Sequence, residues 1–299
     1  MLHSLLKYSF SHRNKVRTRF APSPTGHLHL GHLYAAVIAH DLAIRLDGEY
    51  LLRFEDIDIT RVRDKYYHSI LEDLHFFELK HHTAPISQLA EERSLAYASA
   101  LNKLEHLGVT YPCFCTRKEI STELISITNA PHKKDYQTQH YPGICKKLSS
   151  EKILEHLNAG KTPAIRLDAD KAKALTGELS FKDLRHGSQS VDHHILGDCI
   201  LARKDIGTSY HIASVVDDNY QEISHVTRGD DLLESTHLHR ILQSLLGFHE
   251  PIYLHHPLVV NTKNERLSKR AESISIKSLQ KSGHTKLSLL EMIKLQLEK

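Results

Sequence analysis

The sequence lacks any apolar run long enough to cross a membrane, and cysteine is scarce. A membrane-spanning helix needs about 20 mostly apolar residues, so we expect no membrane span. Residues 1–15, MLHSLLKYSFSHRNK, have too short an apolar region and no small-residue cleavage site for a secretory signal. Four cysteines among 299 residues are too few for a disulfide scaffold and favour a reducing compartment. We therefore expect a cytoplasmic protein with an N-terminal extension at 1–15.

The chain also carries little net charge, because 39 Lys and Arg residues face 36 Asp and Glu residues, which leaves +3. This mildly basic balance permits a nucleic-acid partner without requiring one. Histidine is abundant, with 25 residues that include the pairs His81–His82, His193–His194 and His255–His256. We expect most of these scattered histidines to lie on solvated surface, and they do not indicate a metal-storage protein.

The first part of the chain has the pattern of a strand, a loop, a helix and a second strand. Residues 16–21 predict a short strand, and PSPTG at 22–26 predicts a loop. Apolar residues of 29–48 fall largely on one helical face, and we expect Gly48 to end this helix as a C-cap glycine. EYLLRFEDID at 49–58 predicts the next strand. Such βαβ units bind ligands at helix N-termini, beyond the carboxyl ends of the strands.

The remaining segments continue an α/β pattern. Helical patterns are followed by a segment rich in Cys, Lys and His, and a second α/β stretch begins near residue 195. We expect helices over 62–78 and 88–107, a strand in 197–205, a helix in 209–218, a strand running into a loop in 222–233, a strand and a basic loop in 253–270, and helices in 273–299.

Residues 19–32, RFAPSPTGHLHLGH, place His29 and His32 at the first turn of the predicted helix. Unpaired N–H groups and the helix dipole favour anions there, so we expect a phosphate near both histidines. The distant loop RLSKR at 266–270 would suit a polyphosphate whose charge moves during a reaction. Alone, each motif also fits surface histidines or a solvated basic loop, and it is their pairing that favours nucleotide chemistry.

These motifs, with RFEDID at 53–58, resemble the class I aminoacyl-tRNA synthetases, and in particular their glutamyl/glutaminyl branch. The resemblance covers roughly residues 16–275. A full glutamyl-tRNA synthetase continues past the lysine loop with a large anticodon-binding portion, whereas only residues 271–299 follow it here. This abbreviated form is similar to the glutamyl-Q tRNA(Asp) synthetases, which attach glutamate to the queuosine base of tRNA(Asp).

The resemblance implies a role for each matching residue. His29, Gly31, His32 and Lys269 would bind ATP, the two histidines would stabilise the α-phosphate transition state, and Lys269 would bind the departing pyrophosphate. The residues implied for the glutamate pocket are Arg19, Phe20, Ala21, Pro22, Ser23, Glu55, Tyr210 and Arg228.

Glutamate carries two carboxylates and one ammonium group, so its pocket needs cations, hydrogen-bond donors and an anion. Arg19 and Arg228 would supply the cations, and Glu55 the anion. Which arginine binds the side-chain carboxylate stays open, and Arg19 could instead merely pair with Glu55. We expect Asp217 and Asp218 to shape the site or to hold the ribose-like group of the acceptor, because the phosphate of an adenylate can itself accept the proton.

A second constellation offers three thiolates, from Cys113, Cys115 and Cys145. A structural zinc site needs four ligands, and from chemistry alone the fourth would be His140 or His132. The resemblance implies Tyr141 instead, because YPGIC at 141–145 fits the Tyr-x-x-x-Cys ligand pair of the family. The alternative is three reduced cysteines without a metal. We expect Cys199, in the apolar segment LGDCILAR, to be a core residue.

The predicted fold class is α/β, with a Rossmann-like nucleotide-binding core split by a zinc-bearing insertion. The expected divisions are the extension at 1–15, the first half of the core at 16–110, the insertion at 111–194, the second half of the core at 195–255, and the lysine loop with a C-terminal helical segment at 256–299.

We expect a monomer. The resemblance implies that the chain activates L-glutamate with ATP and Mg²⁺ to glutamyl-adenylate without tRNA. Glutamate then passes to the cyclopentenediol of queuosine at the wobble position of tRNA(Asp), with one structural Zn²⁺ in the protein. The alternatives are a truncated conventional glutamyl-tRNA synthetase, a non-catalytic tRNA-binding paralogue, and another adenylylating enzyme with a small-molecule acceptor.

Overall fold

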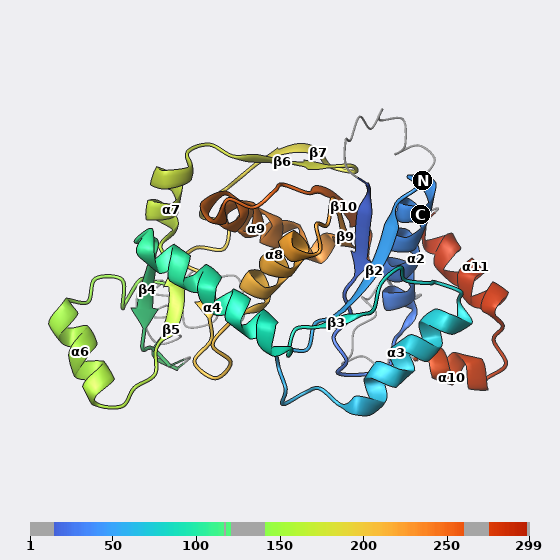
Figure 1. The fold of residues 1–299 in the computed structure, drawn as a ribbon, viewed down its shortest axis with the longest axis horizontal. Coiled ribbons are helices and arrows are strands. Elements are labelled where there is room, and N and C mark those ends of the chain that lie inside the picture. The colour runs from blue at the N-terminus through green and yellow to red at the C-terminus, as the bar shows by residue number, and fades with distance from the viewer. Residues whose placement is uncertain (1–14, 117, 121–140, 260–274, 298–299) are drawn as a thin grey trace, which may run out of the picture.

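The computed structural model describes residues 15–116, 118–120, 141–259 and 275–297, which Figure 1 shows as a ribbon. Four features of the sequence analysis fall outside these described residues, namely most of the N-terminal extension, Lys269 with its loop, His132 and His140. None of the helices within the described ranges is both long enough and apolar enough to span a bilayer.

The predicted βαβ unit is confirmed. It consists of β1 (Arg17–Phe20), α2 (Leu30–Arg45) and β2 (Glu49–Phe54), and the two strands pair in parallel. Buried apolar residues recur along α2 at Leu33 and Leu42, so this helix covers one face of the strands.

We had expected Gly48 as the C-cap residue of α2, but this residue is Leu46, although the N–H of Gly48 donates to the carbonyl of Ala43 in the last turn. The helix ends at Arg45, and the residue with left-handed backbone after it is Asp47, with a φ of 48°. Gly48 is required for a different reason. A Cβ atom at this position would lie 2.4 Å from the carbonyl oxygen of Val16, so only glycine lets the chain enter β2 so close to β1.

The core sheet is built from two groups of mainly parallel strands. The first has the order β1–β2–β3, and the second β7–β6–β10–β9, in which β7 alone is antiparallel. The further strands are β3 (Ile86–Ser87), β6 (Ser180–Asp183), β7 (Gly187–Ser190), β9 (His225–Gly229) and β10 (Ile252–His256). Ser224 joins the groups, because its backbone N–H donates to the carbonyl of Arg17 and its hydroxyl accepts from the N–H of Arg17.

A smaller antiparallel sheet lies beside this core, at the left of Figure 1. Its strands are β4 (Thr110–Cys113), β5 (Ala164–Leu167) and β8 (Ile200–Ala202). The pairing of β8 with β5, and of β6 with β10, crosses the divisions expected at 111–194 and 195–255. The chain therefore passes between the two sheets more often than a simple insertion would.

The structure confirms the helices predicted over 62–78, 88–107 and 209–218 and at the C-terminal end. The sequence analysis missed α9, which begins where a loop was expected. The bounds are α3 (Asp64–Phe76), α4 (Glu91–His106), α6 (Ser150–Asn158), α7 (Ala169–Thr176), α8 (Tyr210–Tyr220), α9 (Leu233–Leu246), α10 (Ile276–Lys281) and α11 (Lys286–Leu297). Buried polar residues on α9, such as Thr236, His239 and Gln243, interrupt its apolar pattern.

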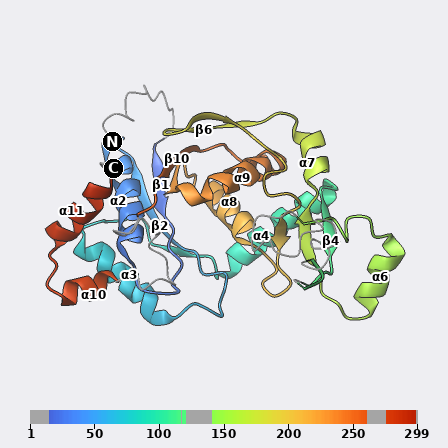
Figure 2. The same ribbon diagram turned by 180° about the vertical axis from the view of Figure 1, so that it is seen from behind.

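Two apolar clusters cover the two faces of the core sheet. One joins α2, α3, α10 and α11, and the other joins α4, α8 and α9. Figure 2 shows the same division from behind, with α10 and α11 beside α2 and α3. Strand β2 faces both clusters, because Tyr50, Leu52 and Phe54 pack toward α2 whereas Leu51 packs toward α8. This alternation decides where the polar residues of the strands point.

Candidate active site

The side-chain alternation of the strands brings three arginines to the same face of the sheet. Arg53 shares the α8-facing side of β2 with Leu51, and Arg228 shares that side of β9 with Val226. Arg19 reaches the same layer from β1, where its guanidinium bonds Asp218 of α8. All three lie near the carboxyl ends of parallel strands, the edge at which open α/β sheets bind ligands.

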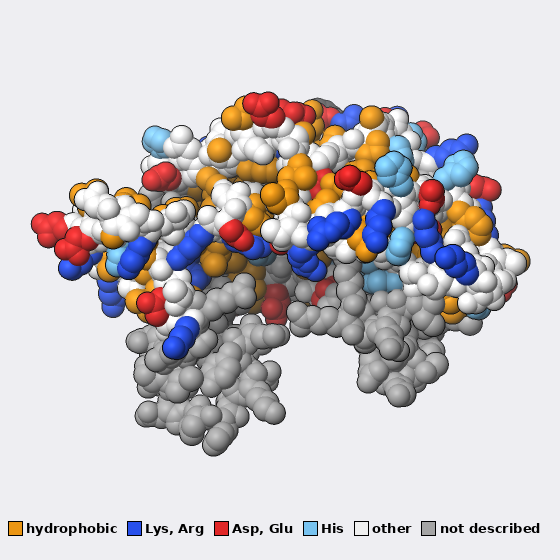
Figure 3. Space-filling view, turned by 90° about the horizontal axis from the view of Figure 1, so that it is seen from below, with side chains coloured by type: hydrophobic (Ala, Val, Ile, Leu, Met, Phe, Trp, Pro, Cys, Tyr) orange, Lys and Arg blue, Asp and Glu red, His pale blue; other side chains and the backbone are white. Residues whose placement is uncertain are grey.

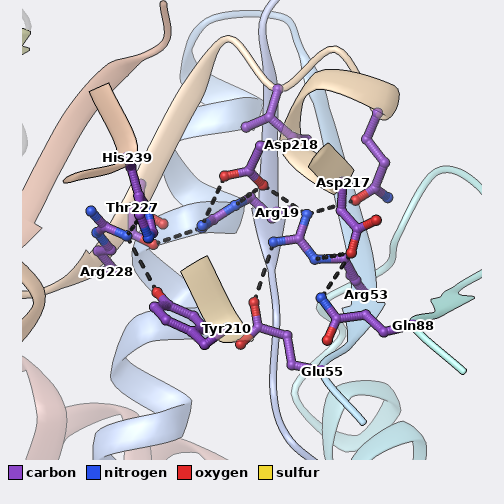
Figure 4. A network of polar contacts seen from close by, with 12 residues as sticks. Arg19, Arg53, Glu55, Gln88, Tyr210, Asp217, Asp218, Thr227, Arg228 and His239 are labelled. Carbon is purple, nitrogen blue, oxygen red and sulfur yellow. Dashed lines mark hydrogen bonds and ion pairs between the residues drawn. The ribbon is translucent and has the colours of Figure 1, made fainter. Parts of the chain in front are cut away.

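Asp218 is the centre of the first polar network, shown in Figure 4. Its Oδ1 accepts from Arg19 Nε at 2.9 Å and from Arg53 Nη1 at 2.7 Å. Arg19 also donates to the carbonyl of Thr227 at 3.0 Å. Burial alone would raise the pKa of Asp218, but the charges of Arg19 and Arg53 outweigh it and lower the pKa to about 2.

Glu55, directly after β2, takes its hydrogen bond from Arg53, with 3.3 Å between Nη2 and Oε1. Burial raises the pKa of Glu55, and the positive charges of Arg53 and Arg19 oppose that rise. Arg19 therefore pairs with Asp218, and its expected alternative, a simple pair with Glu55, is not formed among the described contacts. Glu55 also lines a pocket beside this network.

Asp217, the neighbour of Asp218, is fully buried and accepts hydrogen bonds from Gln88, Arg93 and Tyr97. These contacts tie α8 to α4, and burial raises the pKa of Asp217. Both aspartates therefore have internal partners and shape the site, which is the first of the two roles expected for them.

Arg228 has a different environment, because each of its hydrogen-bond partners is uncharged or an imidazole. Nη1 bonds the Tyr210 hydroxyl at 3.3 Å and His239 Nδ1 at 3.1 Å. Nε donates to His255 Nε2 at 3.1 Å, and Nη2 donates to Thr236 Oγ1 at 2.5 Å. No carboxylate of the described residues lies within ion-pair distance of this guanidinium, although only 6% of Arg228 is exposed.

The histidines around Arg228 are held neutral. Burial is the main cause that lowers the pKa of His211 to about 4, that of His239 well below its ordinary value, and that of His255. Most of the described histidines are at least partly exposed, as expected, but His255, His256 and His193 are buried. The burial of His255 and His256 follows from their place in β10, which lies between β6 and β9 in the sheet.

A pocket of about 880 Å³ opens beside this network. Its walls come from both sheets and include Ser23, Glu55 and Tyr210 of the core and Tyr141, Arg166 and Asp198 of the smaller sheet and its flanks. Phe20, which was also expected in the pocket, has its side chain in the cluster that packs on α2. The carbonyl of Pro22 accepts from the backbone N–H of Glu55 and so holds the loop after β1 against the end of β2.

Sequence reasoning missed Arg53, His239 and His255, which hold the predicted residues in place. The signal for Arg53 was a charged residue within the apolar strand pattern of β2, because a fully buried arginine requires acidic partners. The signal for His255 was its position in an equally apolar strand.

His29 and His32 lie at the start of α2, as predicted, and there they cap the helix. His29 Nδ1 accepts from the backbone N–H of Gly31 at 3.1 Å, and His32 Nδ1 accepts from the N–H of His29 at 3.2 Å. The rings stack with 3.7 Å between their centroids. This reciprocal cap holds both imidazoles at the N-terminal end of the helix, where the macrodipole favours an anion.

Two described residues that flank the basic loop lie at this same turn. Ser275 forms an antiparallel bridge with His29, and Ile276 donates its N–H to the carbonyl of Leu28. A Cβ at Gly31 would lie 4.0 Å from Cβ of Val259. Val259 and Ser275, the described residues on either side of the stretch that contains Lys269, therefore both lie beside the turn at the start of α2.

The three predicted cysteines converge at the end of β4, with their sulfurs within 4.8 Å of one another. Tyr141 joins them, because its hydroxyl oxygen lies 3.4 Å from the sulfurs of both Cys113 and Cys115. Thiolates bound at about 2.3 Å to a tetrahedral zinc ion lie roughly 3.8 Å apart, so this donor set fits a metal. Cys199 lies apart from the cluster, where it packs against the core and lines the pocket.

Arg166 of β5 links this cluster to the pocket. Its guanidinium lies 3.7 Å from the centroid of the Tyr141 ring and donates to the carbonyl of Asp198 at 2.8 Å. Asp198 in turn accepts from the Tyr111 hydroxyl at 2.7 Å. The cysteine cluster therefore sits behind one wall of the same pocket that Glu55 and Tyr210 line on the other side.

Comparison with known proteins places the chain in a class. The model of the catalytic domain of class I tRNA synthetases (E and Q) matches residues 15–297, and the chain belongs to this family. It is thus a tRNA ligase with the Rossmann-like fold of that class, and the resemblance drawn from its motifs is confirmed.

Two relatives bear one name, Glutamyl-Q tRNA(Asp) synthetase. The relative from Rhodobacter capsulatus is 36% identical over 92% of this chain and 99% of its own length. The one from Nitratidesulfovibrio vulgaris is 38% identical over 90% of this chain and 82% of its own length. Among solved structures, a glutamate tRNA ligase from Elizabethkingia meningosepticum in complex with its amino acid is similar with a TM-score of 0.71 and 28% identity. This similarity covers 86% of the chain but 52% of that ligase.

Proposed function

We propose that this chain activates L-glutamate with ATP and Mg²⁺, without tRNA, and transfers it to the cyclopentenediol of queuosine in tRNA(Asp). In the first step the α-carboxylate of glutamate attacks the α-phosphorus of ATP, and pyrophosphate leaves. In the second, a ring hydroxyl of queuosine attacks the carbonyl carbon, its proton passes to the phosphate, and AMP leaves. The names of the two relatives support this acceptor, and a tRNA acceptor would place the reaction in the cytoplasm.

The observation that carries the substrate assignment is the charge pattern of the three arginines. Arg19 and Arg53 are matched by Asp218, Asp217 and Glu55, whereas the partners of Arg228 within the described part of the chain are all neutral. A buried cation without an anion is costly, and a carboxylate that binds beside it recovers much of that cost. We therefore assign the side-chain carboxylate of glutamate to Arg228, next to the Tyr210 hydroxyl.

The other end of the amino acid has a matching group in Glu55. Its carboxylate lines the pocket and is held by Arg53, so it can accept hydrogen bonds from the substrate ammonium group. Ser23 lines the same pocket and offers a hydroxyl. Glu55 and Tyr210 both line this pocket, and Arg228 donates to the Tyr210 hydroxyl, so the anion and the cation that an acidic amino acid requires both lie at or directly behind its walls.

The nucleotide would bind at the start of α2. His29, Gly31 and His32 form the capped turn there, and the proposal assigns the ATP phosphates to it. Lys269, outside the described residues, would neutralise the departing pyrophosphate, and the anchoring of Val259 and Ser275 beside the turn supports this role. Catalysis would rest on positioning and on stabilising phosphate charge.

We assign one structural Zn²⁺ to Cys113, Cys115, Cys145 and Tyr141. A closed set of four protein ligands makes a metal ion structural, because it leaves no open position for a substrate. When bound, the ion would stabilise the thiolate forms and cross-link β4 to the segment around Tyr141 and Cys145. The three sulfurs and the phenol oxygen within one cluster support this assignment.

A polyanionic partner fits the surface. Figure 3 shows several Lys and Arg side chains across the face that is seen from below, with histidines and a smaller number of acidic side chains among them. Such a distribution attracts phosphate backbones even though the net charge is only +3. We propose that the chain meets tRNA(Asp) as a monomer.

A glutamate-transfer assay tests the proposal. Radiolabelled glutamate and ATP are incubated with the protein and one of three acceptors, which are tRNA(Asp) with queuosine, tRNA(Asp) without it, and tRNA(Glu). Label on queuosine-containing tRNA(Asp) alone is the expected result. Label on tRNA(Glu) would instead assign an abbreviated conventional glutamyl-tRNA synthetase, the activity named for the solved structure from Elizabethkingia.

Exchange between ATP and pyrophosphate separates the remaining alternatives. Glutamate-dependent exchange without transfer to any tRNA would keep the adenylate chemistry and exclude the proposed acceptor. Absence of both exchange and transfer would leave a non-catalytic tRNA-binding protein. Lys269→Ala tests the role of the lysine in this exchange. We expect the variant to abolish exchange, because the departing pyrophosphate loses the cation that neutralises it.

A further inference from the structure

The side chain of Arg228 is held by two imidazoles that approach it from neighbouring elements. His239 comes from α9, and His255 is the direct register partner of Arg228 on the adjacent strand β10. Their nitrogens both lie 3.1 Å from the guanidinium, on Nη1 and on Nε. His239 is 2% exposed and His255 is fully buried, so no solvent competes for these contacts.

The chemistry of arginine decides the tautomer of each ring. A guanidinium can only donate hydrogen bonds, so the nitrogen that faces Arg228 must accept and carries no proton. In His239 this nitrogen is Nδ1, and its protonated Nε2 then donates to Nδ1 of His211 at 3.1 Å. In His255 the accepting nitrogen is Nε2, and its protonated Nδ1 donates to Asp183 Oδ2 at 2.7 Å. The two rings therefore hold opposite tautomers.

Asp183 fixes the second ring from behind. Its carboxylate also accepts from the backbone N–H groups of Arg185, His186 and His255. Four donors leave Asp183 firmly placed at the end of β6, in the strand next to β10. Its charge is separated from Arg228 by a whole imidazole ring, so Asp183 orients His255 without forming an ion pair with the arginine.

We propose that His239 and His255 are positioning residues for recognition of the substrate carboxylate, because they fix Arg228 as neutral acceptors and leave its charge unmatched. An aspartate or glutamate in their place would hold the guanidinium equally well, but it would neutralise the charge that the substrate needs. This inference rests on the proposed function, in which Arg228 binds the side-chain carboxylate of glutamate.

The opposite tautomers allow a matched test with asparagine and glutamine. The amide oxygen of asparagine can replace Nδ1 of a histidine, and that of glutamine can replace Nε2. His239→Asn and His255→Gln therefore keep the acceptor on Arg228, whereas His239→Gln and His255→Asn remove it. The Michaelis constants for glutamate and for ATP are measured in ATP–pyrophosphate exchange, with the full chain and without tRNA.

We expect His239→Gln and His255→Asn to raise KM for glutamate by about tenfold to one hundredfold, which corresponds to the loss of one charge-assisted hydrogen bond. His239→Asn and His255→Gln should stay within about threefold of the wild type, and KM for ATP should not change in any variant. A purely structural role of the histidines would not produce opposite preferences for Asn and Gln at the two positions. His106→Gln, on the exposed end of α4, is the control for the substitution itself.

Three results would overturn the inference. Equal effects of Asn and Gln at either position, or the reverse order, would show that the acceptor on Arg228 is unimportant. Parallel rises in KM for glutamate and for ATP would show a general loss of the fold, which urea unfolding of each variant would reveal independently. Absence of glutamate-dependent exchange in the wild type would overturn the proposed function itself, and the inference with it.

Discussion

At the scale of single residues, the site depends on which charges are matched inside the protein. Arg19, Arg53 and Arg228 come from similar positions near strand ends, yet two are paired with aspartates and one is surrounded by neutral groups. Residue type alone cannot distinguish them, because each is an arginine in a strand of the core sheet. Because their partners differ, we expect substitution of Arg19 to affect stability and substitution of Arg228 to affect glutamate binding.

Replacing Arg228 with methionine should affect glutamate far more than ATP. We expect KM for glutamate to rise by about tenfold to one hundredfold, because a charged hydrogen bond of about 1.5–3 kcal/mol is lost, while KM for ATP changes less than about threefold. ATP–pyrophosphate exchange measures both. Equal rises for the two substrates would remove Arg228 from the carboxylate site.

Replacing Arg19 with methionine should instead weaken the fold. Asp218 would keep only Arg53 as a charged partner, and breaking a buried pair in this way costs about 3–5 kcal/mol. Urea unfolding should show the loss in the free energy of unfolding, with Arg45→Met as a control for an exposed pair with Asp41. A loss no larger than that of the control would contradict the buried network.

Asp73 on α3 should make stability depend on pH. It is 2% exposed, its Oδ2 has no hydrogen-bond partner among the described residues, and burial raises its pKa to about 7. Because the folded protein then keeps a proton that the unfolded chain releases near pH 4, the free energy of unfolding should fall by up to about 4 kcal/mol between pH 4 and pH 7.

Asp73→Asn removes this proton. The variant should unfold at higher urea than the wild type at pH 8, and the difference between the two proteins should shrink as pH falls toward 4. Urea unfolding at several pH values measures it. Parallel pH profiles of the two proteins would show that Asp73 does not titrate in this way.

At the scale of elements, the site depends on how strands and helices begin and end. His29 and His32, to which we assign the ATP phosphates, also form the cap of α2. Folding of this helix therefore already orients both imidazole rings. The loop after β1 is held to the end of β2 through the contact between Pro22 and Glu55. At the other end of these two strands, Gly48 lets the chain enter β2 close to Val16, which precedes β1.

Gly48→Ala tests this close approach. The added Cβ would lie 2.4 Å from the Val16 carbonyl oxygen, so the entry to β2 must move, and we expect a loss of about 2–4 kcal/mol in the free energy of unfolding. Gly187→Ala is the comparison, because its φ of 77° strains an alanine although no atom lies within 4 Å. That variant should lose only about 1–2 kcal/mol. Urea unfolding that ranks the two variants in the opposite order would contradict the steric argument.

At the scale of the whole molecule, the pocket lies between the core sheet and the smaller antiparallel sheet. Glu55 and Tyr210 line it from one side, and Tyr141 and Arg166 from the other. The cysteine cluster stands behind the second wall, so a metal ion would set the position of that wall relative to the core.

Cys145→Ser should therefore lose metal and loosen that wall. We expect the wild type to contain about one zinc ion per chain by elemental analysis, and the variant to contain much less, because one of four ligands is weakened. Cys199→Ser is the matched control, since Cys199 lies outside the cluster, and it should retain zinc. Wild-type protein without zinc, prepared without chelators, would refute the site.

The sequence by itself determined the class of the fold and the group of cysteines that the structure brings together. Local patterns were sufficient for β1, α2 and β2, because alternation and helical periodicity are properties of neighbouring residues. The spacing of the three cysteines likewise predicted a cluster, and their sulfurs do converge. The motifs that contain His29 and Glu55 predicted the family of the chain, and the comparisons show that the chain belongs to it.

Only the tertiary structure decided how the arginines are partnered and where the histidines lie. Arg53 meets Asp218, 165 residues away, and His255 meets Asp183, 72 residues away, and no local pattern contains such contacts. Gly48 and α9 were misjudged for the same reason. Gly48 is required by the nearby backbone of Val16. The buried polar residues His239 and Gln243 of α9 are required by their hydrogen bonds with Arg228 and Tyr253. Burial and charge matching depend on what the folded chain brings together, so they could not be predicted from periodicity.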